Sequence, residues 1–262
     1  MTKILHMDFV YCKVPAAPLR KEAAHRSEMV SQLLFGETAE ILAQSGLFTQ
    51  LRCRYDGYEG WCQTSQLCKI GAAEVENQLP LLSGDWDSLI EYQQHPMHIP
   101  MGASLGLWLG DKKYSAPESV KMTGTVCDPA TTVFSPEAIR ERAFQYLNTP
   151  YLWGGRSVYG IDCSGFAQQV YRFFHRPLPR DAWQQAGIGE VVGFLQESVC
   201  GDLAFFDNEE GKITHVGILL GTDTLIHSSG QVRVDRIDTQ GILNAETGER
   251  THRLRIIKRY VN

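Results

Sequence analysis

The sequence has no run of apolar residues long enough to cross a membrane. No window approaches the roughly 18 consecutive apolar residues that a helical span needs. An excess of positive charge is also absent, because 30 acidic residues oppose 25 basic ones and leave a formal net charge of −5. We therefore expect neither a membrane nor a nucleic acid as a partner.

The cysteines fit neither a disulfide framework nor a metal site. Their number, seven, is odd, and Cys53, Cys62 and Cys68 lack the paired C-x₂-C spacing of structural zinc sites. The opening MTKILHMDFVYCKVP has no uninterrupted apolar core of a secretory signal, since Asp8 and Lys13 break it. We expect no metal, no cofactor and a reducing cytoplasm, provided that no signal peptide has been removed.

The length of 262 residues predicts two or three domains. Residues 1–70 are typical of short strands in a small all-β barrel, with a hairpin turn at Asp56-Gly57. Residues 71–128 are less regular, with a helical turn or two in EVENQLPLLSGDWDSLIEYQQ and then short, glycine-punctuated strands. This segment is either a second barrel unit or an extension of the first.

Residues 129–262 predict an α+β domain, with helices first and an antiparallel sheet afterwards. Ser135-Pro136-Glu137 is typical of a helix start, and an apolar stripe follows at Ile139, Ala143, Tyr146 and Leu147. A second helix begins at about Asp162. Strands are expected at 201–207, 212–220, 224–230, 231–237 and 253–261. The basic strand from Arg250 to Arg259 is either a solvated face or an anion-binding patch, and we favour the former.

The stretch PYLWGGRSVYGIDCSGFAQQVYRFF (150–174) places Cys163 in the first turn of a helix. Phe166, Val170, Tyr171 and Phe174 give that helix one apolar face. The unpaired N–H groups of a helix start favour an anion, so we expect the pKa of the thiol to be lowered and the thiol to be reactive. The alternative is a buried cysteine at the start of an amphipathic helix.

Two of the eight histidines have a pattern that favours function. His215 lies in KITHVGILL and His227 in TLIHSSG, and a turn at Gly221 to Asp223 would place them on adjacent antiparallel strands. Either is by itself more often a structural histidine. With Cys163 they form a nucleophile, a base and an orienting residue. The other six histidines, among them His252, lack any such pattern.

Five motifs resemble, in their order, the NlpC-type cell-wall peptidases. They are Tyr-Leu-Trp-Gly-Gly, Asp-Cys-Ser-Gly-Phe, Gly-Asp-Leu-Ala-Phe-Phe, Thr-His-Val-Gly-Ile and Ile-His-Ser-Ser-Gly, within residues 135–262. The resemblance implies a papain-like α+β fold with Cys163 as nucleophile, His215 as base and His227 as orienting residue. It also implies that Tyr151 lies near the nucleophile and helps to hold the oxyanion.

The N-terminal segments APLR, SEMVSQLLFGE and LRCRYDGYEGWCQTSQL resemble a bacterial SH3-type domain over about residues 8–70. The whole chain then resembles γ-D-glutamyl-L-diamino-acid endopeptidases, which cut small murein peptides that have a free N-terminal L-alanine. The resemblance implies that Asp162, Glu37 and Tyr58 pair with the substrate ammonium. It implies further substrate-binding residues at Ser164, Trp153 and Asp181. Without it, Glu37 is a turn acid, Tyr58 a packing aromatic and Asp181 a helix cap.

One position departs from that family: Ala182 follows Arg180-Asp181, where a serine is common, so a substrate hydrogen bond would be missing. The predicted function is a monomeric cytoplasmic cysteine peptidase that recycles murein peptides, with diaminopimelate or lysine as the diamino acid. One alternative is an acyltransferase or amidase that uses the same Cys-His pair. Another is a non-catalytic wall-binding protein.

Overall fold

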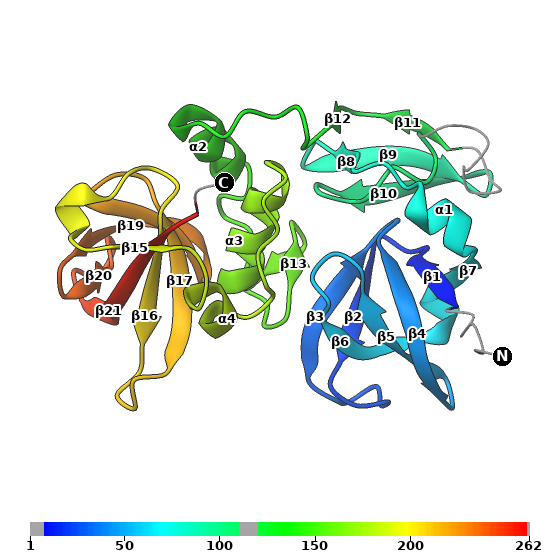
Figure 1. The fold of residues 1–262 in the computed structure, drawn as a ribbon, viewed down its shortest axis with the longest axis horizontal. Coiled ribbons are helices and arrows are strands. Elements are labelled where there is room, and N and C mark those ends of the chain that lie inside the picture. Colours follow the sequence, from blue (N-terminus) through cyan, green and yellow to red (C-terminus); the bar gives the residue numbers. More distant parts are fainter. Residues whose placement is uncertain (1–7, 110–119, 261–262) are drawn as a thin grey trace, which may run out of the picture. The chain divides into compact units, whose positions relative to one another are not determined.

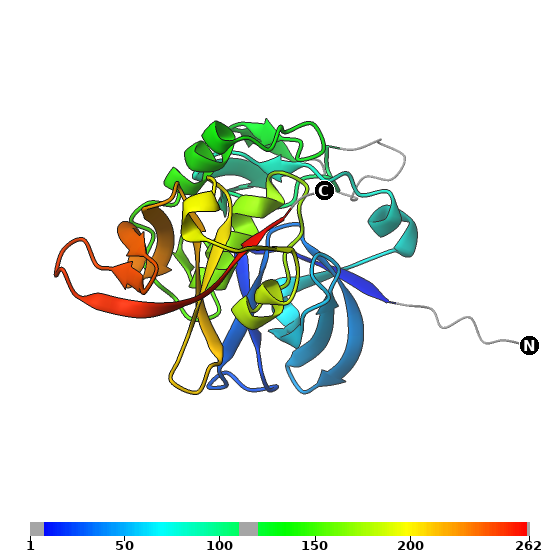
Figure 2. The same ribbon diagram turned by 60° about the vertical axis from the view of Figure 1, so that its left-hand side comes forward.

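The computed structural model describes residues 8–109 and 120–260, which divide into two units between Thr131 and Thr132. Residues 1–7 of the N-terminal stretch and residues 110–119 of the glycine-punctuated segment lie outside the described residues, as does Val261. Figures 1 and 2 show a first unit built mainly of strands and a second with its helices early and its sheet late. Within the described ranges, no helix is long and apolar enough to cross a membrane.

The first unit begins with a seven-stranded antiparallel sheet in the order β3-β2-β6-β5-β4-β1-β7. The predicted hairpin is confirmed: β5 pairs with β6, and in the turn the Tyr58 N–H donates to Asp56 Oδ1 at 3.0 Å. Gly57 takes a φ of 71° there, which favours glycine. The strands are β1 (Phe9–Cys12), β2 (Ala16–Arg20), β3 (Met29–Leu34), β4 (Thr38–Ser45), β5 (Phe48–Cys53), β6 (Glu59–Gln63) and β7 (Leu67–Ile70), with the 3-10 turn η1 (Thr64–Gln66).

The described residues of 71–128 pack against this sheet through an aromatic core. The Phe35 ring stacks on Trp108, with centroids 4.6 Å apart, and Tyr92 contacts both rings edge-on. Within residues 74–94 the expected helical turns are limited to the end of α1, because Asp87–Tyr92 alternates exposed and buried residues and is a strand. The elements are α1 (Ala72–Glu76), β8 (Leu82–Ser83), β9 (Asp87–Tyr92), β10 (His95–Pro100), β11 (Lys121–Thr123) and β12 (Val126–Cys127).

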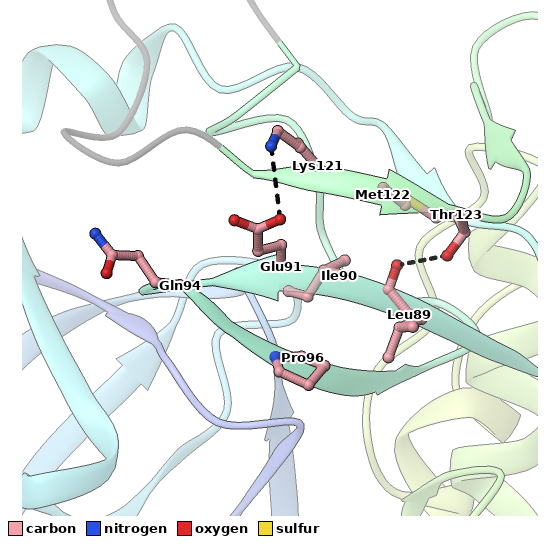
Figure 3. A pocket seen from close by; sticks show the side chains of 8 residues that line it. All are labelled: Leu89, Ile90, Glu91, Gln94, Pro96, Lys121, Met122 and Thr123. Carbon is pink, nitrogen blue, oxygen red and sulfur yellow. Dashed lines mark hydrogen bonds and ion pairs between the residues drawn. The ribbon is translucent and has the colours of Figure 1, made fainter.

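The sheet β10-β9-β11 has a hollow of about 340 Å³ (Figure 3). The Lys121 ammonium lies 3.6 Å from a carboxylate oxygen of Glu91, and the Thr123 hydroxyl donates to the Leu89 carbonyl. Its polar side chains are thus used largely to join β9 to β11.

The helices of the second unit begin at the predicted residues. Ser135 caps α2 by accepting a hydrogen bond from the Ala138 N–H, and Asp162 caps α3 by accepting one from the Gly165 N–H. The first helix is shorter than expected: it ends at Phe144, and Leu147 is exposed. The apolar face predicted behind Cys163 is buried along its length. The helices are α2 (Pro136–Phe144), α3 (Cys163–Arg172) and α4 (Ala182–Ala186).

The sheet of the second unit has the order β15-β21-β16-β17-β18-β19-β20, with all neighbours antiparallel. An additional β20–β21 pairing closes the strands from β21 to β20 into a ring, and β15 pairs with β21 outside it. Helix α3 packs against β17 and β18. The remaining elements are β13 (Arg156–Ser157), β14 (Gly160–Ile161), β15 (Glu190–Val192), η2 (Leu195–Glu197), β16 (Leu203–Asp207), β17 (Ile213–Leu219), β18 (Thr224–Ser229), β19 (Gln231–Asp238), β20 (Gly241–Leu243) and β21 (Arg250–Arg259).

The basic strand β21 has arginines that pair with acids of neighbouring segments. Arg250 pairs with Asp238, at a closest distance of 2.6 Å. Arg253 pairs with Asp207 at 2.8 Å, and Arg259 with Asp202 at 2.7 Å. These pairs support a solvated strand face rather than an anion-binding patch.

Phe205, in β16, provides a test of the sheet core because its side chain is fully buried. We expect Phe205→Ala to lower the free energy of unfolding by about 3–5 kcal/mol, through lost apolar burial and the cavity left behind. The matched control is Phe194→Ala, since Phe194 is 68% exposed and its loss should change stability by less than about 0.5 kcal/mol. Equal urea midpoints for the two variants would contradict this packing.

Candidate active site

Cys163 is the first residue of α3, as predicted, and its side chain is buried. Backbone groups of Val216, in β17, and of Ser164 form hydrogen bonds with the thiol that favour its ionised form. Val216 follows His215 directly in the sequence. The nucleophile predicted from the helix start therefore lies against the strand that holds the predicted base.

The expectation of a lowered thiol pKa is wrong for this geometry. Burial raises the pKa of Cys163 to about 12, and the negative charge of Asp162 acts in the same direction. The backbone donors and Arg180 oppose this increase without overcoming it. In the resting site Cys163 is therefore a neutral thiol, and it needs a base to become a nucleophile.

His215 and His227 meet on adjacent strands, as their spacing predicted. β17 pairs with β18, with Gly217 opposite His227, and His215 Nε2 lies 2.7 Å from His227 Nδ1. Both imidazoles are buried. Burial, assisted by the neighbouring His227 and His252, holds the pKa of His215 well below its usual range. His215 is thus a neutral base at pH 7.

Asp235, in β19, extends this pair and was missed by sequence reasoning. Its Oδ2 lies 2.9 Å from His227 Nε2, and its side chain is buried. Burial alone would raise the pKa of Asp235, but hydrogen bonds from His227, the Ala245 N–H and Arg233 outweigh it and lower the pKa to about 2. The available signal was a hairpin turning at Gly230, which brings Asp235 to the strand beside His227.

His252, in β21, had no sequence pattern that favoured function, but it lies against His215. Its ring stacks on that of His215, with centroids 4.2 Å apart and planes 27° apart. Burial lowers the pKa of His252 to about 4, so this ring is also neutral at pH 7. It covers one face of His215 with an uncharged aromatic surface.

Tyr151 precedes β13 and forms an isolated bridge with Ile161. Burial raises the pKa of its phenol to about 12, and the neighbouring Cys163 and Asp162 act in the same direction. The phenol therefore keeps its proton at pH 7 and can donate a hydrogen bond. Its electrostatic coupling to Cys163 agrees with a place near the nucleophile.

Asp162 has a dense set of partners within its own unit. Arg180 binds both carboxylate oxygens, with Nη2 to Oδ2 at 2.6 Å and Nη1 to Oδ1 at 3.0 Å. The N–H groups of Gly154 and Gly165 donate to the same carboxylate, and the Ser164 hydroxyl lies between it and Arg180. The charge expected to attract a substrate ammonium is thus offset by a buried guanidinium.

The other predicted substrate residues have different surroundings. Glu37 is buried in the β3–β4 turn, where its Oε2 accepts a hydrogen bond from the Leu34 N–H at 2.9 Å. Tyr58 lies in the β5–β6 turn. Trp153 is 60% exposed in the loop before β13. Asp181 is the N-cap residue of α4, and its N–H donates to Gln184 Oε1.

The described residues contain no cluster of three or more His, Cys, Asp or Glu side chains arranged to hold a metal ion.

Two family models match the chain. The NlpC/P60 family model matches residues 148–251, and a model described as the bacterial dipeptidyl-peptidase SH3 domain matches residues 19–67. The γ-D-glutamyl-L-lysine dipeptidyl-peptidase of Bacillus subtilis (strain 168) is 30% identical over 214 residues, which are 76% of this chain and 71% of that protein. The probable endopeptidase NlpC of Escherichia coli (strain K12) is 42% identical over 93 residues, which are 35% of this chain and 60% of that protein.

A solved structure shows the same fold. An NlpC/P60 family protein from Bacillus cereus ATCC 10987 matches with a TM-score of 0.76 at 18% identity, over 97% of this chain and 100% of that one. The order of an SH3-like domain followed by an NlpC/P60 papain-like domain confirms the predicted fold.

The Arg180–Asp162 pair can be tested through stability. We expect Arg180→Met to lower the free energy of unfolding by about 3–5 kcal/mol, because it leaves Asp162 as an unpaired charge in a buried site. Arg250→Met is the matched control: its pair with Asp238 is partly exposed and should contribute at most about 1 kcal/mol. Urea unfolding of both variants measures the difference, and equal losses would contradict a dominant buried pair.

Proposed function

This chain belongs to the NlpC/P60 family and is a cell-wall cysteine peptidase, and on that premise we propose its substrate and its catalytic residues. The substrate is a small murein peptide with a free N-terminal L-alanine. The bond cut is the one between D-glutamate, linked through its γ-carboxyl, and the following L-diamino acid. Cys163, His215 and His227 carry out the reaction.

The similarity to the Bacillus subtilis γ-D-glutamyl-L-lysine dipeptidyl-peptidase is the observation that supports the proposed substrate. It extends over 214 residues, which is too long for either unit alone. The family model that matches residues 19–67 is described as the SH3 domain of a bacterial dipeptidyl-peptidase. A shared arrangement of domains supports a shared substrate class more strongly than a match of the catalytic unit alone.

The proposed acylation begins with transfer of the Cys163 proton to His215, which breaks the S–H bond and forms an N–H bond. The thiolate attacks the γ-carbonyl carbon, and the carbonyl electron pair moves onto oxygen. Backbone N–H groups at the start of α3 and the Tyr151 hydroxyl are the expected donors to that oxyanion. When the carbonyl re-forms, the C–N bond breaks and the leaving amine takes the proton from His215.

Deacylation completes the cycle. The intermediate is a thioester between Cys163 and the γ-carboxyl of D-glutamate. Water attacks it after giving a proton to His215, and the sulfur leaves and recovers that proton. The products are L-Ala-D-Glu and a free diamino acid or the peptide that begins with it.

Recognition of the free amine is part of the proposal. Asp162, Glu37 and Tyr58 remain the residues expected to bind it. Arg180 already pairs with the carboxylate of Asp162, so the proposal does not rest on Asp162 alone. An enzyme that needs this amine acts on peptides already released from the wall, which agrees with the proposed recycling role in the cytoplasm.

Blocking the substrate amine tests the specificity. We expect N-acetylation of L-Ala-γ-D-Glu-diaminopimelate to lower kcat/KM by about 100-fold or more, because a lost buried ion pair costs about 3 kcal/mol or more. Mass spectrometry of the products measures cleavage, and Cys163→Ala should show none on either peptide.

Equal cleavage of the free and acetylated peptides would contradict amine recognition. Residual cleavage by Cys163→Ala would contradict the assigned nucleophile. Products that carry the acyl group on an added amine, without water incorporation, would favour an acyltransferase.

A further inference from the structure

A continuous line of hydrogen bonds joins three neighbouring strands behind the nucleophile. It runs from Asp235 in β19 to His227 in β18 at 2.9 Å, and from His227 to His215 in β17 at 2.7 Å. All three side chains are buried. We propose that Asp235 is a positioning residue that sets the tautomers of both histidines and leaves Nδ1 of His215 as the proton acceptor for Cys163.

The donor and acceptor in each hydrogen bond determine where His227 and His215 carry their protons. An ionised carboxylate only accepts hydrogen bonds, so the single proton that the proposal gives to His227 lies on Nε2, which faces Asp235. Its Nδ1 then has a lone pair and must accept from His215 Nε2. The proton of neutral His215 is thus on Nε2, and the lone pair is on Nδ1.

The position of the thiol agrees with this assignment. Nδ1 is the ring nitrogen closer to the backbone of its own residue, and Cys163 forms a hydrogen bond with the backbone of the next residue, Val216. The inference rests on the proposed roles of Cys163, His215 and His227 and adds the group that orients them.

The same line stabilises the charge that proton transfer creates. When the thiol proton moves to His215 Nδ1, the ring becomes an imidazolium that donates through Nε2 to His227. His227 in turn donates to the carboxylate of Asp235. A neutral histidine in the orienting position stabilises an imidazolium only weakly. The buried carboxylate of Asp235 behind it supplies the negative charge that such a histidine lacks.

Asp235 is held independently of the histidines. Its Oδ1 accepts from the Ala245 N–H at 2.8 Å and from Arg233 Nη2 at 3.1 Å, and Arg233 Nε lies 2.9 Å from Oδ2. Glu246 pairs with Arg233 at the surface, and His252 of β21 stacks on His215. These are the charged and titratable groups that face the line from the neighbouring segments.

Asp235→Asn is a sharp test because the surroundings fix how the amide turns. Two donors face the Oδ1 position and Arg233 Nε alone lies beside Oδ2 on the arginine side, which favours the amide oxygen at Oδ1 and directs the NH₂ group toward His227 Nε2. In this variant His227 accepts at Nε2 and carries its proton on Nδ1, where it donates to His215 Nε2. His215 then also carries its proton on Nδ1. The base would present N–H to the thiol.

We expect Asp235→Asn to lower kcat by about 100-fold or more with KM little changed, since the base has the wrong tautomer. Long-range ¹H–¹⁵N spectra should show Nε2–H on His215 and His227 in the wild type and Nδ1–H on both in the variant. The matched control is Asp238→Asn on the same strand, whose pair with Arg250 is exposed and which should change neither tautomer nor kcat.

Unchanged tautomers together with unchanged kcat in Asp235→Asn would overturn the inference. If that variant does not fold, the wild-type spectrum decides alone, because Nδ1–H on either histidine contradicts the assignment. The spectra use no substrate. A wild-type enzyme that shows the expected tautomers but does not cut the murein peptide would remove the proposed substrate and leave the role of Asp235 intact.

Discussion

The buried ion pair between Arg180 and Asp162 holds the start of α3, and the position of the nucleophile depends on it. Asp162 caps the helix through the Gly165 N–H and fixes the preceding loop through the Gly154 N–H. Arg180 neutralises the charge that these tasks bury. Cys163, the next residue, is thereby held against β17, so a residue that the sequence assigned to substrate recognition also has a structural task.

Two opposing effects decide the state of the thiol. A helix start and backbone donors favour the thiolate, whereas burial favours the neutral thiol, and burial dominates. His215 is neutral for the same reason. When the thiol and the imidazole are both neutral, the proton can move only if the lone pair of His215 lies on the nitrogen that faces Cys163. The hydrogen bonds from Asp235 through His227 meet that need, which links the sheet register to the chemistry.

The sequence predicted what depends on local patterns. The helix starts at Ser135 and Asp162 follow from capping chemistry, and the meeting of His215 with His227 follows from a short turn between alternating strands. Asp235 and His252 depend on strand register and on closure of the sheet by β21, which local spacing does not specify. The thiol pKa was mispredicted because burial is a property of the assembled core.

In the proposed mechanism, Cys163 rests as a neutral thiol and gives its proton to an oriented His215. Thiolate absorbance near 240 nm, titrated against pH for the wild type and for Cys163→Ala, tests it most directly. Because burial raises the pKa of Cys163 to about 12, the difference between the two proteins should show no thiolate at pH 7 and should rise only in strong alkali. A thiolate signal at pH 7 that disappears in Cys163→Ala would contradict the account.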